Sequence, residues 1–394
     1  MDRGLKLTTP DGSERRRLLL VVQLPPPVHG ASVVNQQVVN SAELRKFFTC
    51  TVVRLDATLD LAEIRKFSFL KVFRSLRTFW RVAWVLSKDK PDLVYLTMAP
   101  KGLAFYRDAV LVFMFRWVRV RHILHFHGRG LAQMQRSSLA SGFARAVLKR
   151  ATIIHLSPSL MADIAPFVHC SQVRFVANGV PDIAAKLQHE LHGDHRSATI
   201  LFLGTMLESK GALVLLAALT ELRRRGTSFQ ALFAGPWRGS LTREEFEREV
   251  NQSGLAEQVR HLGAVYGEEK DELLRSGDIF AFPTHYENEA FPLVVLEAMA
   301  AGLVPVTSNI AALPAIVAEA GLTVPPKDPE ALADALQKLI DNPIQLAQLK
   351  KMARARYLAN FTLQHFERNL AATLVWAIDA DTVRANDKIE EMQT

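Results

Sequence analysis

Cysteine is scarce in this sequence of 394 residues. Its two cysteines, Cys50 and Cys170, lie far apart and can form neither a disulfide framework nor a cysteine-rich metal site. Unpaired, reduced cysteines are usual in the cytosol, whereas small secreted domains depend on disulfides. The composition therefore favours a cytoplasmic protein.

Long apolar runs are also missing. A bilayer span needs about 20 predominantly apolar residues in succession. The uncharged stretch 298–318 is interrupted by Gly302, Pro305 and Pro314, and the apolar run 109–115 is too short. Residues 1–17 are polar and basic, without the apolar segment of a signal peptide. We therefore expect a soluble chain that can contact a membrane only peripherally.

Two nucleotide-related signatures are absent. The first apolar run leads into Pro-Pro-Pro-Val-His-Gly at 25–30, which is not the Gly-x-Gly-x-x-Gly fingerprint of dinucleotide-binding folds. No recognisable nucleic-acid-binding module occurs either, so we expect no nucleic-acid partner.

What the sequence does contain is a regular alternation of short β-branched runs with helical stretches. This pattern predicts parallel sheets with crossover helices, hence an α/β fold. Strands are predicted at 18–22, 51–55, 93–97, 122–126, 153–156, 173–176, 200–203, 231–234, 259–262, 279–282 and 304–307. The polar stretch 186–197 shows neither the periodicity of a helix nor that of a strand, and it is the best linker candidate. We predict two Rossmann-like domains facing across a cleft, at 1–185 and 198–360, with a helical segment at 361–394 that could pack back on the first.

Charge is divided unequally between the two halves. Residues 1–180 contain 27 lysines and arginines against 11 aspartates and glutamates, a net +16, whereas the remainder has 21 against 29, a net −8. A basic half suits an anionic partner such as an acidic membrane surface, although a merely solvated surface is the alternative.

The segment 61–86 favours the membrane. On a helix, its large apolar residues form one stripe and its basic residues a neighbouring one, as in helices that lie in a lipid interface. The proposed membrane contacts are Lys66, Arg74, Arg77, Arg81, Trp80 and Trp84. The alternative is a core helix whose aromatic stripe packs on a sheet.

The ends of the predicted strands carry the candidate chemistry, because ligands bind at the carboxyl ends of parallel strands. Gly30 follows the first strand and allows close backbone approach before a helix. By strand alternation His125 and His127 point to the same side, and His127 lies at the carboxyl end of the strand 122–126. Lys210 precedes a helix, where a cation is unfavourable unless an anion lies between the two.

Two carboxylates stand out after the strand 279–282. Glu289 lies in a loop, and Glu297 lies about one and a half turns into a helix that starts near Pro292. Helical side chains lean towards the N-terminus, so both carboxylates can reach the same crevice beside the free amides of the first turn. Capping would explain Glu289, but a carboxylate within the apolar run 293–299 needs another reason.

At this point the sequence resembles glycosyltransferase family 4, a group of retaining GT-B enzymes. The resemblance covers nearly the whole chain, and its most specific part is Glu289 to Gly302, with two glutamates followed by Ala-Met-Ala-Ala-Gly. Supporting parts are the Pro-Pro-Pro-Val-His-Gly loop, His-Phe-His-Gly at 125–128 and Ser-Lys-Gly at 209–211. The proline-rich loop is similar to the corresponding loop in the subgroup of the family that acts in bacterial surface-polysaccharide assembly.

The resemblance implies a nucleotide diphosphate sugar as donor. The basic first half and the segment 61–86 lead us to expect a lipid-linked glycan as acceptor, reached at the inner face of the cytoplasmic membrane. The resemblance further implies that Glu297 binds the donor ribose, and that Glu289 and His127 contact the transferred sugar. The diphosphate would be held by Lys210 and by backbone amides around Phe291 to Leu293, a stretch that includes Pro292, and Gly30 would let its loop close over the diphosphate. No metal or other cofactor is expected, because Lys210 and helix amides can stabilise the leaving diphosphate. Asp-Ala-Asp at 379–381 matches a metal-binding string, but it lies away from any strand end.

The sequence departs from the family at one position. The family usually has an arginine five residues before the lysine, and Thr205 stands there. Arg129 could supply the missing charge. Two alternatives stay open: a catalytically silent GT-B binding protein, which Thr205 favours, and a nucleotide-sugar epimerase on the same fold. A phosphorylase would normally be a much longer chain.

Overall fold

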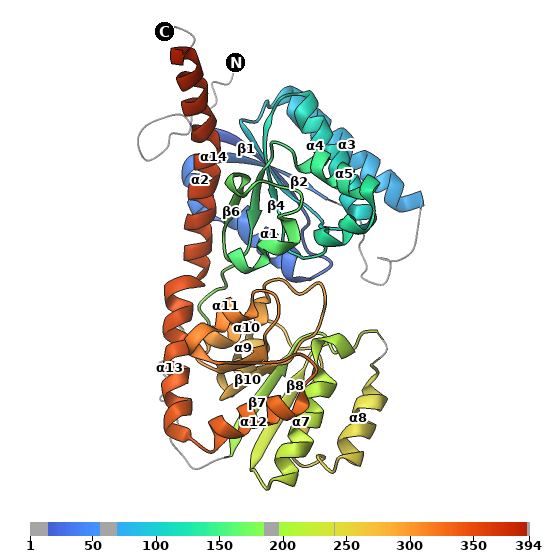
Figure 1. Cartoon of the computed structure of the whole chain (residues 1–394), viewed down its shortest axis with the longest axis vertical. Coiled ribbons are helices and arrows are strands. Elements are labelled where there is room, and N and C mark those ends of the chain that lie inside the picture. The colour runs from blue at the N-terminus through green and yellow to red at the C-terminus, as the bar shows by residue number, and fades with distance from the viewer. Residues whose placement is uncertain (1–14, 56–68, 185–196, 240, 392–394) are drawn as a thin grey trace. The chain divides into compact units, whose positions relative to one another are not determined.

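The computed structural model describes residues 15–55, 69–184, 197–239 and 241–391 (Figure 1). The chain divides into two compact units, one of Met1–Ala177 with Gln364–Thr394 and one of Asn178–Leu363. The division thus falls at Ala177, some residues before the predicted end at 185, and the expected linker 186–197 lies almost wholly outside the described residues.

The first unit contains a parallel six-stranded sheet in the order β2-β1-β3-β4-β5-β6. Its strands are β1 (Arg16–Val22), β2 (Phe48–Arg54), β3 (Leu93–Thr97), β4 (Arg121–His125), β5 (Thr152–His155) and β6 (Val173–Phe175). The apolar part of β1, Leu18–Val22, is buried throughout. Such continuous apolar runs are expected of parallel strands that are covered on both faces.

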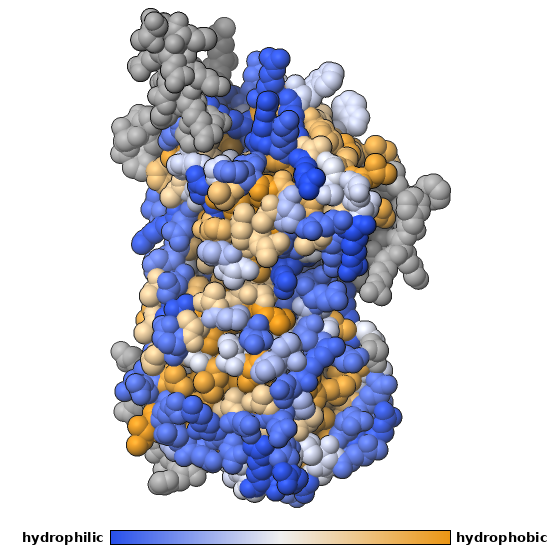
Figure 2. Space-filling model, in the orientation of Figure 1, coloured by the Kyte–Doolittle hydropathy of each residue, from blue (hydrophilic) through white to orange (hydrophobic). Residues whose placement is uncertain are grey.

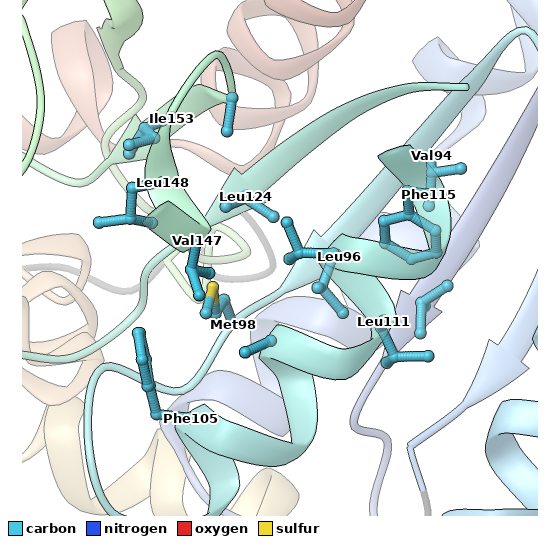
Figure 3. Close-up of a cluster of buried hydrophobic side chains, with 14 of the residues drawn as sticks. Val94, Leu96, Met98, Phe105, Leu111, Phe115, Leu124, Val147, Leu148 and Ile153 are labelled. Atoms are coloured by element: carbon cyan, nitrogen blue, oxygen red, sulfur yellow. The ribbon is translucent and has the colours of Figure 1, made fainter. Parts of the chain in front are cut away.

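Helices cover this sheet. They are α1 (Gly30–Asn40), α2 (Ala42–Phe47), α3 (Phe69–Lys88), α4 (Gly102–Trp117), α5 (Ser138–Leu148) and α6 (Met161–Ile164). Helices α3, α4 and α5 lie side by side on one face (Figure 1). Their inner side chains, among them Phe105, Leu111 and Phe115, meet Leu96 and Leu124 of the sheet in one hydrophobic core (Figure 3).

The last helix, α14 (Leu363–Glu391), packs on the first unit, as the sequence suggested. Leu370 and Leu374 are fully buried, and the guanidinium of Arg174 lies 3.7 Å from the ring centroid of Trp376. Asp379 accepts a hydrogen bond from Arg16 at 2.6 Å. The carboxylate of the Asp-Ala-Asp string therefore attaches α14 to β1.

The second unit contains another parallel six-stranded sheet, in the order β12-β11-β10-β7-β8-β9. Its strands are β7 (Ala198–Leu203), β8 (Phe229–Ala234), β9 (Val259–His261), β10 (Ile279–Phe282), β11 (Val304–Ser308) and β12 (Leu322–Val324). Its helices are α7 (Ala212–Arg224), α8 (Arg243–Gln252), α9 (Gly267–Arg275), α10 (Leu293–Ala300), α11 (Leu313–Val317), α12 (Pro329–Ile340) and α13 (Pro343–Asn360). All eleven predicted strands are present. The sequence missed β12, which has three residues and only one buried side chain.

Helix α3 settles the choice that the sequence left open for its aromatic stripe. The helix turns Val82, Val85 and Leu86 to the core, and its stripe of large apolar side chains faces solvent. Trp80 is 77% exposed. The alternative of a core helix with an aromatic inner stripe is therefore wrong. Lys66 lies outside the described residues.

Candidate functional site

Three loops meet closely at the carboxyl ends of β7, β8 and β10. Gly211 has a φ of +89°, and a Cβ there would lie 2.2 Å from the carbonyl oxygen of Pro283. A Cβ at Gly235, with a φ of +146°, would lie 1.7 Å from the carbonyl oxygen of Gly204. Only glycine permits these approaches. The two glycines therefore allow the loops of three neighbouring strands to form one surface.

Lys210 and Glu289 lie together on this surface. Lys210 Nζ donates to Glu289 Oε2 at 2.6 Å, and the carboxylate side chain is only 9% exposed. The Lys210 ammonium also lies 4.8 Å from the ring centroid of Tyr286. The loop after β10 is held against the loop after β7 because His285 N donates to the Ser209 carbonyl at 2.8 Å. Two residues predicted as donor ligands, 79 positions apart in sequence, are thus brought into contact.

Glu297 has a partner that sequence reasoning missed. Lys270 Nζ, on α9, donates to Glu297 Oε1, on α10, at 2.8 Å. A carboxylate side chain that is only 14% exposed requires such a partner, which explains how Glu297 is tolerated in an apolar helix. Lys270 stands in the charged run Gly-Glu-Glu-Lys-Asp-Glu, which reads as a solvated helix face. Only its position on the helix next to α10 reveals its role.

The start of α10 lies next to these pairs in sequence and has no side-chain cap. Pro292 is the N-cap residue and has no N–H, and Leu293 is the first helical residue. The first amides of a helix have no partner within it, so they are available to an anion. Phe291 is buried, and its ring meets that of Phe361 edge-on at 6.0 Å. This packing fixes the entry into the helix.

In the first unit, Gly30 is the first residue of α1. His29 caps the helix: its Nδ1 accepts from Ser32 N at 3.2 Å, while Ser32 Oγ accepts from His29 N at 3.0 Å. A Cβ at Gly30 would meet no atom within 4 Å. Packing within this unit therefore does not explain the glycine, whereas close approach of a ligand would.

His127 follows β4 and lies against other histidines. Its ring centroid is 4.0 Å from that of His125, so the two point to the same side, as predicted. Tyr95 Oη and His125 Nδ1 are 2.6 Å apart. Both ring nitrogens of His127 are buried, and neither has a hydrogen-bond partner among the described residues. The ring is therefore held by packing, with its polar atoms unused.

Burial keeps these histidines neutral. Burial, with the neighbouring His155 and His29, lowers the pKa of His127 to about 3. Burial also lowers the pKa of His155 to about 4, with Asp163 opposing and Arg129 adding to the shift. At neutral pH the imidazoles can donate or accept hydrogen bonds but carry no charge.

Arg129 lies in a loop whose anchor could not be predicted from the sequence. Asp163 is the anchor: its carboxylate oxygens accept from the amides of Gly130, Leu131 and Ala132 at 3.0–3.2 Å. These amides open the short 3-10 helix Leu131–Arg136. Asp163 thereby positions the loop that carries His127 and Arg129.

Two parallel-sheet units with their polar residues at strand ends define the class: this is the GT-B fold of glycosyltransferases. Residues 186–356 match the family described as glycosyl transferases group 1. The match is confined to this part of the chain, where it agrees with the resemblance drawn from the sequence.

Well-characterised proteins with similar sequences are also glycosyltransferases. The chain is 30% identical over 192 residues to the D-inositol 3-phosphate glycosyltransferase of Corynebacterium diphtheriae, covering 48% of this chain and 44% of that protein. It is 37% identical over 147 residues to the phosphatidyl-myo-inositol mannosyltransferase of Mycolicibacterium smegmatis, covering 36% of each. The matches thus span less than half the length of these relatives.

Solved structures show the fold over almost the whole chain. A glycosyltransferase of Rickettsia africae superposes with a TM-score of 0.73 at 18% identity, covering 92% of this chain and 99% of that one. HepE of Anabaena, in complex with UDP, superposes with a TM-score of 0.68 at 18% identity, covering 91% of this chain and 99% of that one. Among the described residues no helix is long and apolar enough to cross a membrane.

Proposed function

We propose that this protein transfers a sugar from a nucleoside diphosphate to an acceptor. One observation carries the proposal: Lys210 and Glu289 form a pair at the carboxyl ends of β7 and β10, in the loops that precede α7 and the uncapped α10. Cation and free helix amides suit a diphosphate, and the carboxylates suit sugar hydroxyls. The family match and the UDP bound to HepE support the same ligand class.

Each residue then has a defined task. Lys210 and the backbone N–H groups of Phe291 and Leu293 hold the diphosphate, because Pro292 has no N–H, and Gly30 is a further proposed contact. Glu297 accepts from the ribose hydroxyls, and Lys270 orients that carboxylate through its 2.8 Å hydrogen bond. Glu289 and His127 contact the transferred sugar, and Arg129 supplies a further phosphate contact.

The chemistry follows from charge. As the bond to the sugar breaks, the leaving diphosphate gains negative charge, which Lys210 and the α10 amides stabilise electrostatically. His127 is neutral because its pKa lies at about 3, so it acts as a hydrogen-bonding group. We propose retention of anomeric configuration, as the resemblance implies, without a metal. Activity that EDTA abolishes and manganese restores would contradict the metal-free mechanism.

We further propose a lipid-linked glycan as acceptor, reached from the inner face of the cytoplasmic membrane. Arg77, Arg81, Trp80 and Trp84 are exposed on α3, and Arg74 is half-buried. Aromatic and basic side chains on one helix suit an anionic lipid interface.

Thr205 favours a second candidate, a catalytically silent protein that binds a ligand with this fold. The residue lies in the loop after β7, five positions before Lys210, and brings no charge to the diphosphate. Sugar transfer in a radiolabelled assay separates the two functions, because the silent protein binds the donor without turnover.

Donor binding is tested with a panel of nucleotide sugars, by protection against thermal unfolding and then by calorimetry. Lys210→Ala and Glu297→Ala should each weaken binding roughly ten- to a hundredfold, the effect of losing a hydrogen bond to a charged group. Lys350→Ala is the matched control, because Lys350 pairs with Asp278 at 2.9 Å at the opposite end of β10. Unchanged affinity in both site variants would refute the assignment.

A further inference from the structure

Helix α4 carries a second exposed apolar stripe, which the sequence did not single out. Its outward side chains recur at alternating intervals of three and four residues, the spacing of one helix face. They are Leu103, Tyr106, Val110, Phe113 and Trp117. Trp117 is 88% exposed, more than Trp80 on α3. These are large side chains to leave in water at a cost of about 25 cal/mol per Å².

The inner face of α4 is apolar as well. Phe105, Leu111, Val112 and Phe115 are fully buried in the core of the first unit. A helix that is apolar all round is normally covered on every side. The sheet covers the inner face of α4. In the outer stripe, the rings of Tyr106 and Phe113 lie 5.4 and 6.0 Å from the ring of Phe143 on α5, yet the two side chains are still 44% and 41% exposed.

Helices α3 and α4 are neighbours on the same face of the sheet (Figure 1). The core-facing side chains of both helices are buried, and their outer stripes are exposed. Apolar residues gather over this part of the first unit (Figure 2). On α3 the exposed members are Phe73, Leu76, Trp80 and Trp84. Exposed apolar side chains gathered on two neighbouring helices indicate an interaction site.

The charges around the stripes identify the partner as anionic. Helix α3 contains no acidic residue, and its Arg77 and Arg81 are exposed. The acidic residue of α4, Asp108, is fully buried and paired with Arg107 at 2.6 Å. Arg119 is exposed two residues after Trp117. Thus neither helix presents a carboxylate to a negatively charged surface among its described side chains.

Tryptophan and tyrosine beside arginine suit the lipid headgroup region, where the ring is buried and the polar atom stays hydrated. We propose that α3 and α4 form one membrane-binding face, on which α3 supplies the basic charge and α4 the apolar anchor. This proposal rests on the lipid-linked acceptor proposed above. To the basic helix α3 it adds a second helix, α4, and to electrostatic attraction it adds hydrophobic insertion. Binding should therefore have a part that salt does not remove.

The test is co-sedimentation of the full chain with vesicles. Wild type should pellet with vesicles of equal parts phosphatidylcholine and phosphatidylglycerol, partly retained at high salt, where screening shortens the reach of charge to a few ångströms. The variant Leu103→Glu/Val110→Glu/Trp117→Glu changes only exposed residues and should bind at least tenfold more weakly at both salt concentrations. Ile344→Glu, an 84% exposed apolar residue of α13 in the second unit, is the control and should bind as wild type does.

Two results would overturn the proposal. One is a triple variant that pellets like wild type. The other is a wild type that sediments as a dimer, with a triple variant that becomes monomeric without losing vesicle binding, because the face would then bind a second copy of the chain. Thermal protection of the triple variant by nucleotide sugars is measured in parallel. If nucleotide sugars do not protect wild type against thermal unfolding, the proposed function is rejected, whereas the vesicle-binding result is unaffected.

Discussion

Single residues in the candidate site are held by partners that are distant in sequence. Glu289 has Lys210, and Glu297 has Lys270, at 2.6 and 2.8 Å. An unpaired carboxylate at this degree of burial would be costly, so the pairs keep both charges in place before any ligand binds. Ligand groups then meet side chains whose positions are already set, which lowers the entropic cost of binding.

The buried histidines predict a pH dependence of stability. The pKa of His155 is about 4 in the folded chain and near 6.5 in an unfolded one, so the unfolded chain binds more protons between these values. Stability from the neutral imidazole is therefore fully present above pH 6.5 and is lost as pH falls towards 4. The loss from His155 should amount to about 1–3 kcal/mol.

Urea unfolding from pH 7 to pH 4 measures this loss. In His155→Gln, which has no titrating group at that position, the free energy of unfolding should fall less steeply with decreasing pH than in wild type. His169→Gln, at an exposed position, is the control for replacing a histidine by glutamine. Equal slopes in wild type and His155→Gln would contradict the assignment.

At the scale of elements, the loops after β7, β8 and β10 depend on glycine for their close approach. Gly235→Ala would place a Cβ against the Gly204 carbonyl, so the loops must separate. We expect Gly235→Ala to cost about 1–3 kcal/mol more than Gly226→Ala, the range of overpacking. Gly226 also has a positive φ, +77°, but its Cβ would meet no atom within 4 Å.

Comparing Gly235→Ala with Gly226→Ala separates the effect of loop contact on stability from that of backbone strain. Both alanines would have a strained positive φ, but only the Cβ at position 235 would clash with another loop. Thermal and urea unfolding supply the stability difference, and calorimetry with a nucleotide sugar reports the site. Gly235→Ala should also weaken donor binding, since Lys210 lies in the displaced loop region. Equal stability of the two variants would mean that the close approach contributes nothing.

At the scale of the molecule, each unit has its own sheet and core, and the chain returns to the first unit through α14. We therefore expect two unfolding transitions. Leu370→Ala on α14 and Leu296→Ala on α10 remove fully buried side chains from different units, and each should cost about 2–5 kcal/mol.

Each substitution should shift one transition and leave the other in place. A nucleotide sugar should raise the transition that Leu296→Ala lowers, because the proposed phosphate, ribose and sugar ligands Lys210, Glu289 and Glu297 lie in that unit. Differential scanning calorimetry resolves the two events. A single transition that both variants lower equally would show that the units unfold together.

The sequence by itself determined the described strands except β12, because buried parallel strands require continuous apolar runs that are visible locally. It also determined Lys210, Glu289 and Glu297 as candidate ligands, because a charge in an apolar run or at a helix start has few explanations. The charge difference between the halves is likewise a property of the sequence alone.

Only the tertiary structure decided which residues pair and which helix faces are covered. Lys270 and Asp163 act on residues 27 and about 30 positions away, and strand order and helix packing, not spacing, bring them there. Helix α4 is apolar on both faces, so periodicity cannot tell its inner side from its outer one. The sheet makes that choice, because it can cover only one face of a helix and leaves Trp117 in solvent.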